Sequence, residues 1–149
     1  MTFSPEIARE FVENRIAFVQ RMGLKAECLE RGHVQLLAPI EGNQNHIGTM
    51  YAGALFTLAE IPGGALFMTS FDVAHFYPIV KELKIEFLRP ATSDIRCELR
   101  MTDAEIEALQ AAANKQGKVD YLLEAELVDT EGVRVARASG TYQLRRIGS

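Results

Sequence analysis

The chain has 149 residues, and its 20 acidic residues against 16 basic ones leave a net charge of −4. Lys and Arg are scattered along it, so we expect no nucleic-acid partner. The two cysteines, Cys28 and Cys97, lie in alternating apolar stretches without Cys-x-x-Cys spacing, which predicts reduced core residues. The N-terminus MTFSPEIARE lacks an export signal, which predicts a cytoplasmic protein. The length predicts one domain over residues 1–149.

The first predicted elements are a helix and a hairpin. Ser4 followed by Pro5 is typical of a helix start. Apolar and polar residues then alternate on either side of Gly32, which predicts two strands joined by a turn. The helix is expected to continue to Gly23, because an apolar stripe has helical spacing up to that point; its members are Ala8, Val12, Ile16 and Val19.

The segment from Ile47 to Phe71 is almost entirely apolar or small, and Glu60 is its only charged residue. It is long enough to cross a membrane. Glu60, Pro62 and two glycines lie at its centre, however, and this favours a helix buried by a sheet over a membrane span. We expect that helix to begin near Thr49, after the polar loop EGNQNHIGT.

The remaining chain predicts antiparallel strands and one short helix. Thr102 and Glu105 form a capping box at the start of that helix. A phase shift between Val135 and Ala138 indicates a bulge in the last strand. The element order predicts the α+β class, with one antiparallel sheet packed against a central helix. The expected strands cover residues 82–90, 95–102, 119–127 and 133–144.

The lone carboxylate in the apolar helix needs a physical reason. Burying an unpaired carboxylate costs on the order of several kcal/mol, so Glu60 is expected to be paired, to have a raised pKa, or to act in chemistry. The N-terminus of the same helix, about two to three turns away, is suited to stabilise a developing negative charge. The alternative is a structural Glu60 that accepts loop hydrogen bonds or pairs with an arginine across a dimer.

The run NHIGTMYAGALFTLAE resembles the signature of hotdog-fold acyl-CoA thioesterases of the 4-hydroxybenzoyl-CoA and phenylacetate-pathway (PaaI-like) types. That signature has an Asn or Gln, a Gly, then His-Gly-Gly and finally an acid. Asn45, Gly48 and Glu60 match its spacing, whereas residues 51–53 read Tyr-Ala-Gly in place of His-Gly-Gly. ELKIEFLRPA and ARASGTYQL resemble later strands of the same family.

The resemblance implies a hotdog fold, in which a curved antiparallel sheet wraps around a long central helix, and a homodimer or tetramer. It also implies hydrolysis of an acyl-CoA substrate, without a cofactor, at the subunit interface. In that site the Ala52 N–H would polarise the thioester carbonyl, and Glu60 would attack its carbon or activate water. Asn45 would orient the water or the carbonyl from the facing subunit. The implied substrate contacts are His46, Gly48, Thr49, Tyr51, Gly53 and Arg89.

Other functions rank below this one. His33, His46 and His75 lack the i, i+4 spacing of a helical zinc site, so no metal is expected. The serines lack the context of a nucleophile elbow, which argues against a serine hydrolase. Two rivals stay open: a non-catalytic acyl-CoA binding or regulatory module on the same fold, and a hydratase or dehydratase, whose His-containing motifs the chain lacks.

Overall fold

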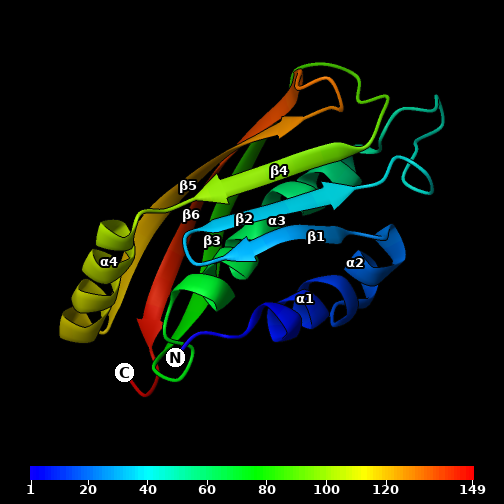
Figure 1. The fold of residues 1–149 in the computed structure, drawn as a ribbon. Coiled ribbons are helices and arrows are strands. Elements are labelled where there is room, and N and C mark those ends of the chain that lie inside the picture. Colours follow the sequence, from blue (N-terminus) through cyan, green and yellow to red (C-terminus); the bar gives the residue numbers. More distant parts are fainter.

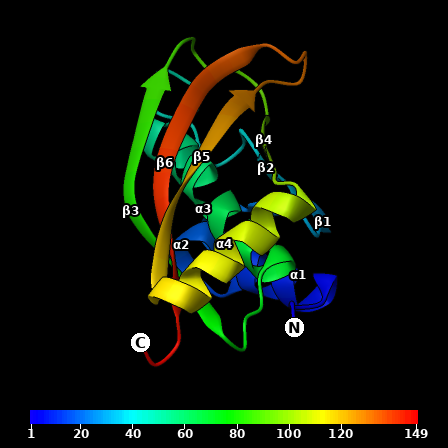
Figure 2. The same cartoon turned by 90° about the vertical axis from the view of Figure 1, so that its left-hand side faces the viewer.

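The structure is a computed structural model that describes residues 1–149. Its six-stranded antiparallel sheet has the order β1-β2-β4-β5-β6-β3 and curves around the long helix α3 (Figure 1). Figure 2 shows α3 between β3, β6 and β5 on one side and β4, β2 and β1 on the other. The predicted α+β hotdog architecture is therefore confirmed. The strands are β1 (Lys25–Glu30), β2 (His33–Ala38), β3 (Phe76–Phe87), β4 (Ile95–Arg100), β5 (Lys118–Val128) and β6 (Arg134–Arg146); the helices are α1 (Pro5–Asn14), α2 (Ala17–Met22), α3 (Ala52–Ser70) and α4 (Asp103–Gln116).

The predicted N-terminal helix is in fact two helices. Ser4 begins α1 as expected, because its hydroxyl accepts a hydrogen bond from the Ile7 N–H at 3.3 Å. Ile16, however, is extended and half exposed, and this breaks the helix. The change of direction allows each half to bury its own apolar pair. These pairs are Ala8 and Val12 in α1, and Val19 and Met22 in α2.

The two edges of the sheet differ. At the β1 edge, the Glu13 carboxylate accepts a hydrogen bond from the Ala26 N–H at 2.8 Å, and the Arg9 guanidinium donates to the Ala26 carbonyl. Helix α1 thus covers backbone groups that an edge strand otherwise offers to another strand. At the opposite edge, β3 pairs only with β6. Its outer side is open, and Val80 and Phe87 are exposed there.

A bulge in β1 changes which side chains enter the core. Ala26 pairs with Leu36 while Cys28 pairs with Gln35, so Glu27 is an extra residue. Leu29 is buried as a result, and Cys28 is only half-buried on the outer face. The prediction of a core Cys28 is wrong, because a bulge reverses the alternation beyond it. Cys97 is buried as predicted, and both thiols are free.

Helix α3 begins at Ala52 with Tyr51 as its N-cap, three residues later than the predicted start at Thr49. The sheet buries most of its circumference, and Leu58 and Leu66 are fully buried. By length and composition α3 could cross a membrane, yet 61% of the apolar window is buried inside the protein. This burial agrees with the predicted central helix.

The insertion between β4 and β5 is longer than predicted. The capping box is confirmed, since Thr102 Oγ accepts from the Glu105 N–H at 3.1 Å and the Glu105 carboxylate accepts from the Thr102 N–H at 2.8 Å. Helix α4 continues to Gly117, whose φ of 89° ends it. In β6 the predicted bulge is present, and Val135 is the extra residue.

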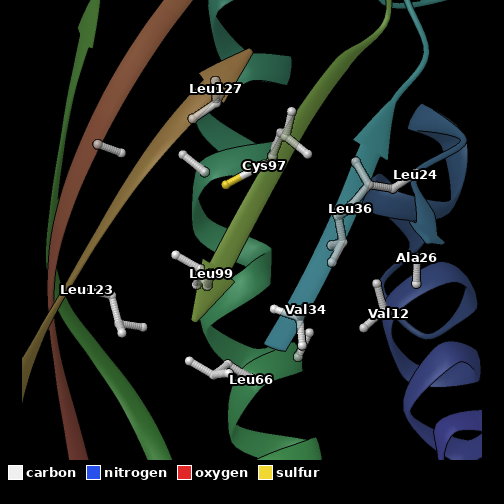
Figure 3. Packing of buried hydrophobic residues seen from close by; sticks show 14 of the residues in the cluster. Val12, Leu24, Ala26, Val34, Leu36, Leu66, Cys97, Leu99, Leu123 and Leu127 are labelled. Carbon is white, nitrogen blue, oxygen red and sulfur yellow. The ribbon is translucent and has the colours of Figure 1, made fainter. Parts of the chain in front are cut away.

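The core fills the space between the concave face of the sheet and α3 (Figure 3). Val34 and Leu36 from β2 and Leu99 from β4 lie over α3 beside Leu66. Fully burying a side chain of this size contributes about 1.5–3 kcal/mol. Packing therefore fixes α3 against the sheet, and with it the residues at the N-terminus of α3.

Candidate functional site

A groove of about 350 Å³ lies beside the N-terminus of α3. Four residues predicted for the site line it: Asn45 and Thr49 from the preceding loop, Ala52 at the helix start, and Arg89 just after β3. The fold thus brings the end of β3 next to the first turn of α3. The rest of the lining is mainly apolar and consists of Ile47, Met50, Leu55, Phe87, Leu88, Pro90 and Ala91.

Asn45 holds the loop before α3 in shape. Its Oδ1 accepts hydrogen bonds from the N–H groups of Ile47 at 3.0 Å and Thr49 at 3.1 Å, and its Nδ2 donates to Thr49 Oγ1 at 2.8 Å. Gly48 has a φ of 88°, which favours glycine. The second N–H of the Asn45 amide makes no hydrogen bond within the chain and can donate to a water or a substrate.

The first turn of α3 presents free hydrogen-bond donors. The N–H groups of Ala52 and Gly53 donate no hydrogen bond within the chain, and the Tyr51 side chain makes no cap. The exposed Tyr51 ring lies beside Gly53, where an added Cβ would meet the ring at 2.5 Å. The two N–H groups and the helix dipole together give this end of the groove a positive field.

Glu60 lies two turns further along α3, on the side that the sheet leaves open. Thr57, Glu60 and Gly64 are half-buried on that side. Burial is what raises the pKa of Glu60 above that of an ordinary glutamate, and no hydrogen bond or neighbouring charge opposes this effect. Within its own chain the carboxylate therefore has no hydrogen-bond or ion-pair partner.

Glu60 and Ala52 of one chain are too far apart to act on one carbonyl group. They are separated by eight residues, which corresponds to about 12 Å along the helix axis. A group that reacts with a carbonyl carbon, or donates to its oxygen, must approach it to about 3 Å. Within one chain these two groups therefore cannot act on the same carbonyl group.

One contact to the backbone of Glu60 could not be predicted from the sequence. The Tyr142 hydroxyl donates to the backbone carbonyl of Glu60 at 3.4 Å. Its ring covers Gly63, where an added Cβ would meet it at 2.5 Å, and it stacks on Tyr121 with 5.9 Å between ring centroids. The buried tyrosine pair on β5 and β6 thus fixes the position of α3 relative to the sheet near Glu60.

The remaining predicted contacts lie around the loop but not all in the groove. His46 is exposed in the loop. Tyr51, together with Asn45, lines a second hollow of about 290 Å³ whose other side is formed by Phe18 and Arg21. Arg89 is exposed and forms no ion pair.

Comparisons with known proteins agree with this fold. A family model described as "Domain of unknown function (DUF4442)" matches residues 5–144. A Pseudomonas aeruginosa protein of unknown function, described as a probable thioesterase, is 56% identical with a TM-score of 0.95 over 98% of each chain. A search of the curated proteins finds no match.

More distant solved structures share the fold. A protein of unknown function from Chlorobaculum tepidum is 21% identical, with a TM-score of 0.81 over 94% of this chain and 93% of its own. A thioesterase from Haemophilus influenzae is 13% identical, with a TM-score of 0.77 over 100% of this chain and 95% of its own. The chain belongs to the DUF4442 family, within the hotdog-fold thioesterase superfamily.

Proposed function

We propose that this protein hydrolyses acyl-CoA thioesters to a free carboxylic acid and CoA. The observation that carries the proposal is the half-buried, unpartnered carboxylate of Glu60 on the same helix whose first residue, Ala52, has a free N–H and lines a mainly apolar groove. The 56% identical relative described as a probable thioesterase supports it. Arg89, exposed at this groove without an ion pair, is suited to contact a phosphate of CoA.

In the proposed reaction the Ala52 N–H, with that of Gly53 beside it, donates to the thioester carbonyl oxygen and stabilises the oxyanion. Glu60 either takes a proton from the attacking water or attacks the carbon itself, forming an anhydride that water then opens. In both routes the carbon–sulfur bond breaks and CoA leaves with a proton on sulfur. No electron is transferred, and no cofactor is required.

The separation of about 12 Å between Ala52 and Glu60 along α3 has a consequence for assembly. We propose that Ala52 and Asn45 of one copy meet Glu60 of a second copy, so that the active unit is a homodimer or a tetramer built from it. The open β3 edge is the natural place to join two sheets, because α1 already covers the β1 edge. Val80 and Phe87 then become buried on pairing.

Val80→Asp is expected to convert the assembly to a monomer and to abolish thiol release, because an aspartate would be buried unpaired at the joined edge. Light scattering coupled to size-exclusion chromatography measures the mass. Leu122→Asp is the matched control, since Leu122 is also an exposed strand residue but lies on β5, away from the edge. A monomeric Val80→Asp with full activity would contradict the shared site.

The hydrolysis itself is tested by thiol release from a panel of acyl-CoA esters, followed with a thiol reagent. The active form of Glu60 is the carboxylate, so kcat/KM is expected to rise with pH through the pKa of this group. That rise should lie above the usual 4.5 of a glutamate, because burial raises the pKa. An activity that is constant from pH 4.5 upward would exclude Glu60 as the base.

A non-catalytic acyl-CoA binding module is the second candidate. One observation favours it, because the Asn45 amide is largely engaged by Ile47 and Thr49 and so has little capacity left to orient a water. Under this alternative the wild-type protein releases no thiol from any ester, while calorimetry detects binding of the same esters. Thiol release by the wild type contradicts the alternative.

A further inference from the structure

The outer face of the β1–β2 hairpin carries a group of three metal-ligating side chains far from the groove. Cys28 Sγ lies 3.4 Å from His33 Nδ1, and the Glu30 carboxylate lies 3.9 Å from the same nitrogen. One ligand atom from each of the three residues lies within 4.8 Å of the other two. The set combines a thiol, an imidazole and a carboxylate, which are the three ligand types that Zn²⁺ takes in proteins.

We propose that Cys28, Glu30 and His33 bind a Zn²⁺ ion on this face of the sheet, with water as the fourth ligand. The site is separate from the proposed thioesterase groove. It was missed in the sequence because the spacing considered there was that of a helix. On a hairpin, Glu30 and His33 are directly opposite each other, and the bulge turns Cys28 to the same face.

The separations fit an ion placed between the ligands. Zinc bonds of ~2.3 Å to sulfur and ~2.05 Å to nitrogen at a tetrahedral angle separate the two ligand atoms by about 3.6 Å. The structure has 3.4 Å between Cys28 Sγ and His33 Nδ1. The corresponding nitrogen–oxygen separation around zinc is about 3.4 Å. The exposed Glu30 side chain, now 3.9 Å away, reaches this by a small rotation.

Glu98 orients the histidine for this role. Its carboxylate lies 2.7 Å from His33 Nε2. Because an ionised carboxylate can only accept a hydrogen bond, this contact favours the tautomer with the hydrogen on Nε2. The lone pair of the neutral ring is then on Nδ1, the atom that faces Cys28 and Glu30. A carboxylate behind a ligating imidazole is the usual arrangement around protein-bound zinc. Arg100 donates to the same Glu98 oxygen at 3.5 Å.

The turn of the hairpin is anchored to the rest of the protein, which fixes the backbone that carries the three ligands. The Gly32 N–H donates to Ser70 Oγ at 2.9 Å, and the Met101 N–H donates to the Gly32 carbonyl at 2.8 Å. Binding forms a sulfur–zinc bond, and the thiol proton of Cys28 leaves to solvent. One thiolate and one carboxylate then balance the charge of Zn²⁺. A ligand set that includes sulfur suits Zn²⁺ better than Mg²⁺, which prefers oxygen ligands.

Titration of the reduced full-length protein with Co²⁺, used as a spectroscopic substitute for Zn²⁺, tests the site. A thiolate-to-cobalt charge-transfer band that saturates at one ion per chain is expected, and Zn²⁺ should displace it. Zn²⁺ alone should raise Tm, while Mg²⁺ should not. Absence of the band would overturn the proposal, whatever the outcome of the thioesterase assays.

Three variants assign the ligands. Cys28→Ser should abolish the band, whereas Cys97→Ala, which removes the buried cysteine, should keep it. Glu98→Gln should weaken binding about 10- to 100-fold without changing the Tm of the metal-free protein, as expected for a positioning residue. A band retained in Cys28→Ser and lost in Cys97→Ala would contradict the assignment. Circular dichroism of each metal-free variant checks that the fold is intact.

Discussion

Glu60→Gln is expected to lower kcat for thiol release by about 10²- to 10⁴-fold, the usual contribution of a general base. Glutamine has nearly the same size but cannot accept a proton or attack a carbonyl carbon. Because the carboxylate has no hydrogen bond or ion pair within the chain, its loss should leave the fold and the assembly unchanged. Steady-state kinetics with a saturating acyl-CoA ester measure the effect.

The stability of the same variant provides an independent check with a defined sign. The folded protein raises the pKa of Glu60, so it binds the proton more tightly than the unfolded chain does. Wild-type stability therefore falls as pH rises from about 4.5 through the raised pKa, and Glu60→Gln should lack this decrease.

Glu107→Gln, on the exposed face of α4, is the control for activity. A Glu60→Gln rate equal to that of the wild type would remove Glu60 from the mechanism.

Gly32→Ala is expected to lower the free energy of unfolding by about 3 kcal/mol. Gly32 has a φ of 73°, and an added Cβ would collide with the carbonyl oxygen of Met101. Backbone atoms on both sides of this contact are held by hydrogen bonds, so neither can move away cheaply. Urea denaturation at one fixed protein concentration gives the free energy.

Gly132→Ala separates the two causes of that loss. Gly132 also lies in a hairpin turn with a left-handed φ, here 79°, but an added Cβ would have no atom within 4 Å. This variant should therefore show only the conformational cost, about 1 kcal/mol. Equal losses in the two variants would mean that the Met101 contact relaxes and contributes nothing.

Patterns set by single elements could be predicted from the sequence. The period-two alternation of β4 and β5, the Thr102–Glu105 capping box and the apolar central helix are all present, because each depends on residues close in the chain. The raised pKa of Glu60 could be expected for a similar reason, since a single charge in an apolar helix is partly removed from water wherever the helix packs.

Features that depend on contacts between distant segments could not be predicted. The exposure of Cys28 follows from a bulge that only the pairing of β1 with β2 reveals, and the break at Ile16 follows from how α1 and α2 pack. The Tyr142 ring over Gly63 joins residues that no local pattern relates. The hydrogen bonds of Asn45 depend on the loop conformation, so the sequence could not show how much of this amide is free.

The difference between the two sheet edges also limits how copies of this chain associate. Arg9 and Glu13 occupy the outward N–H and carbonyl groups of Ala26, so β1 offers no template for a further strand there. In the proposed pairing of two copies through β3, both outer ends of the combined sheet would be β1 edges, which α1 covers at Ala26. Under that proposal lateral growth would stop after one pairing, and the filaments that an open sheet with two bare ends can nucleate would be avoided.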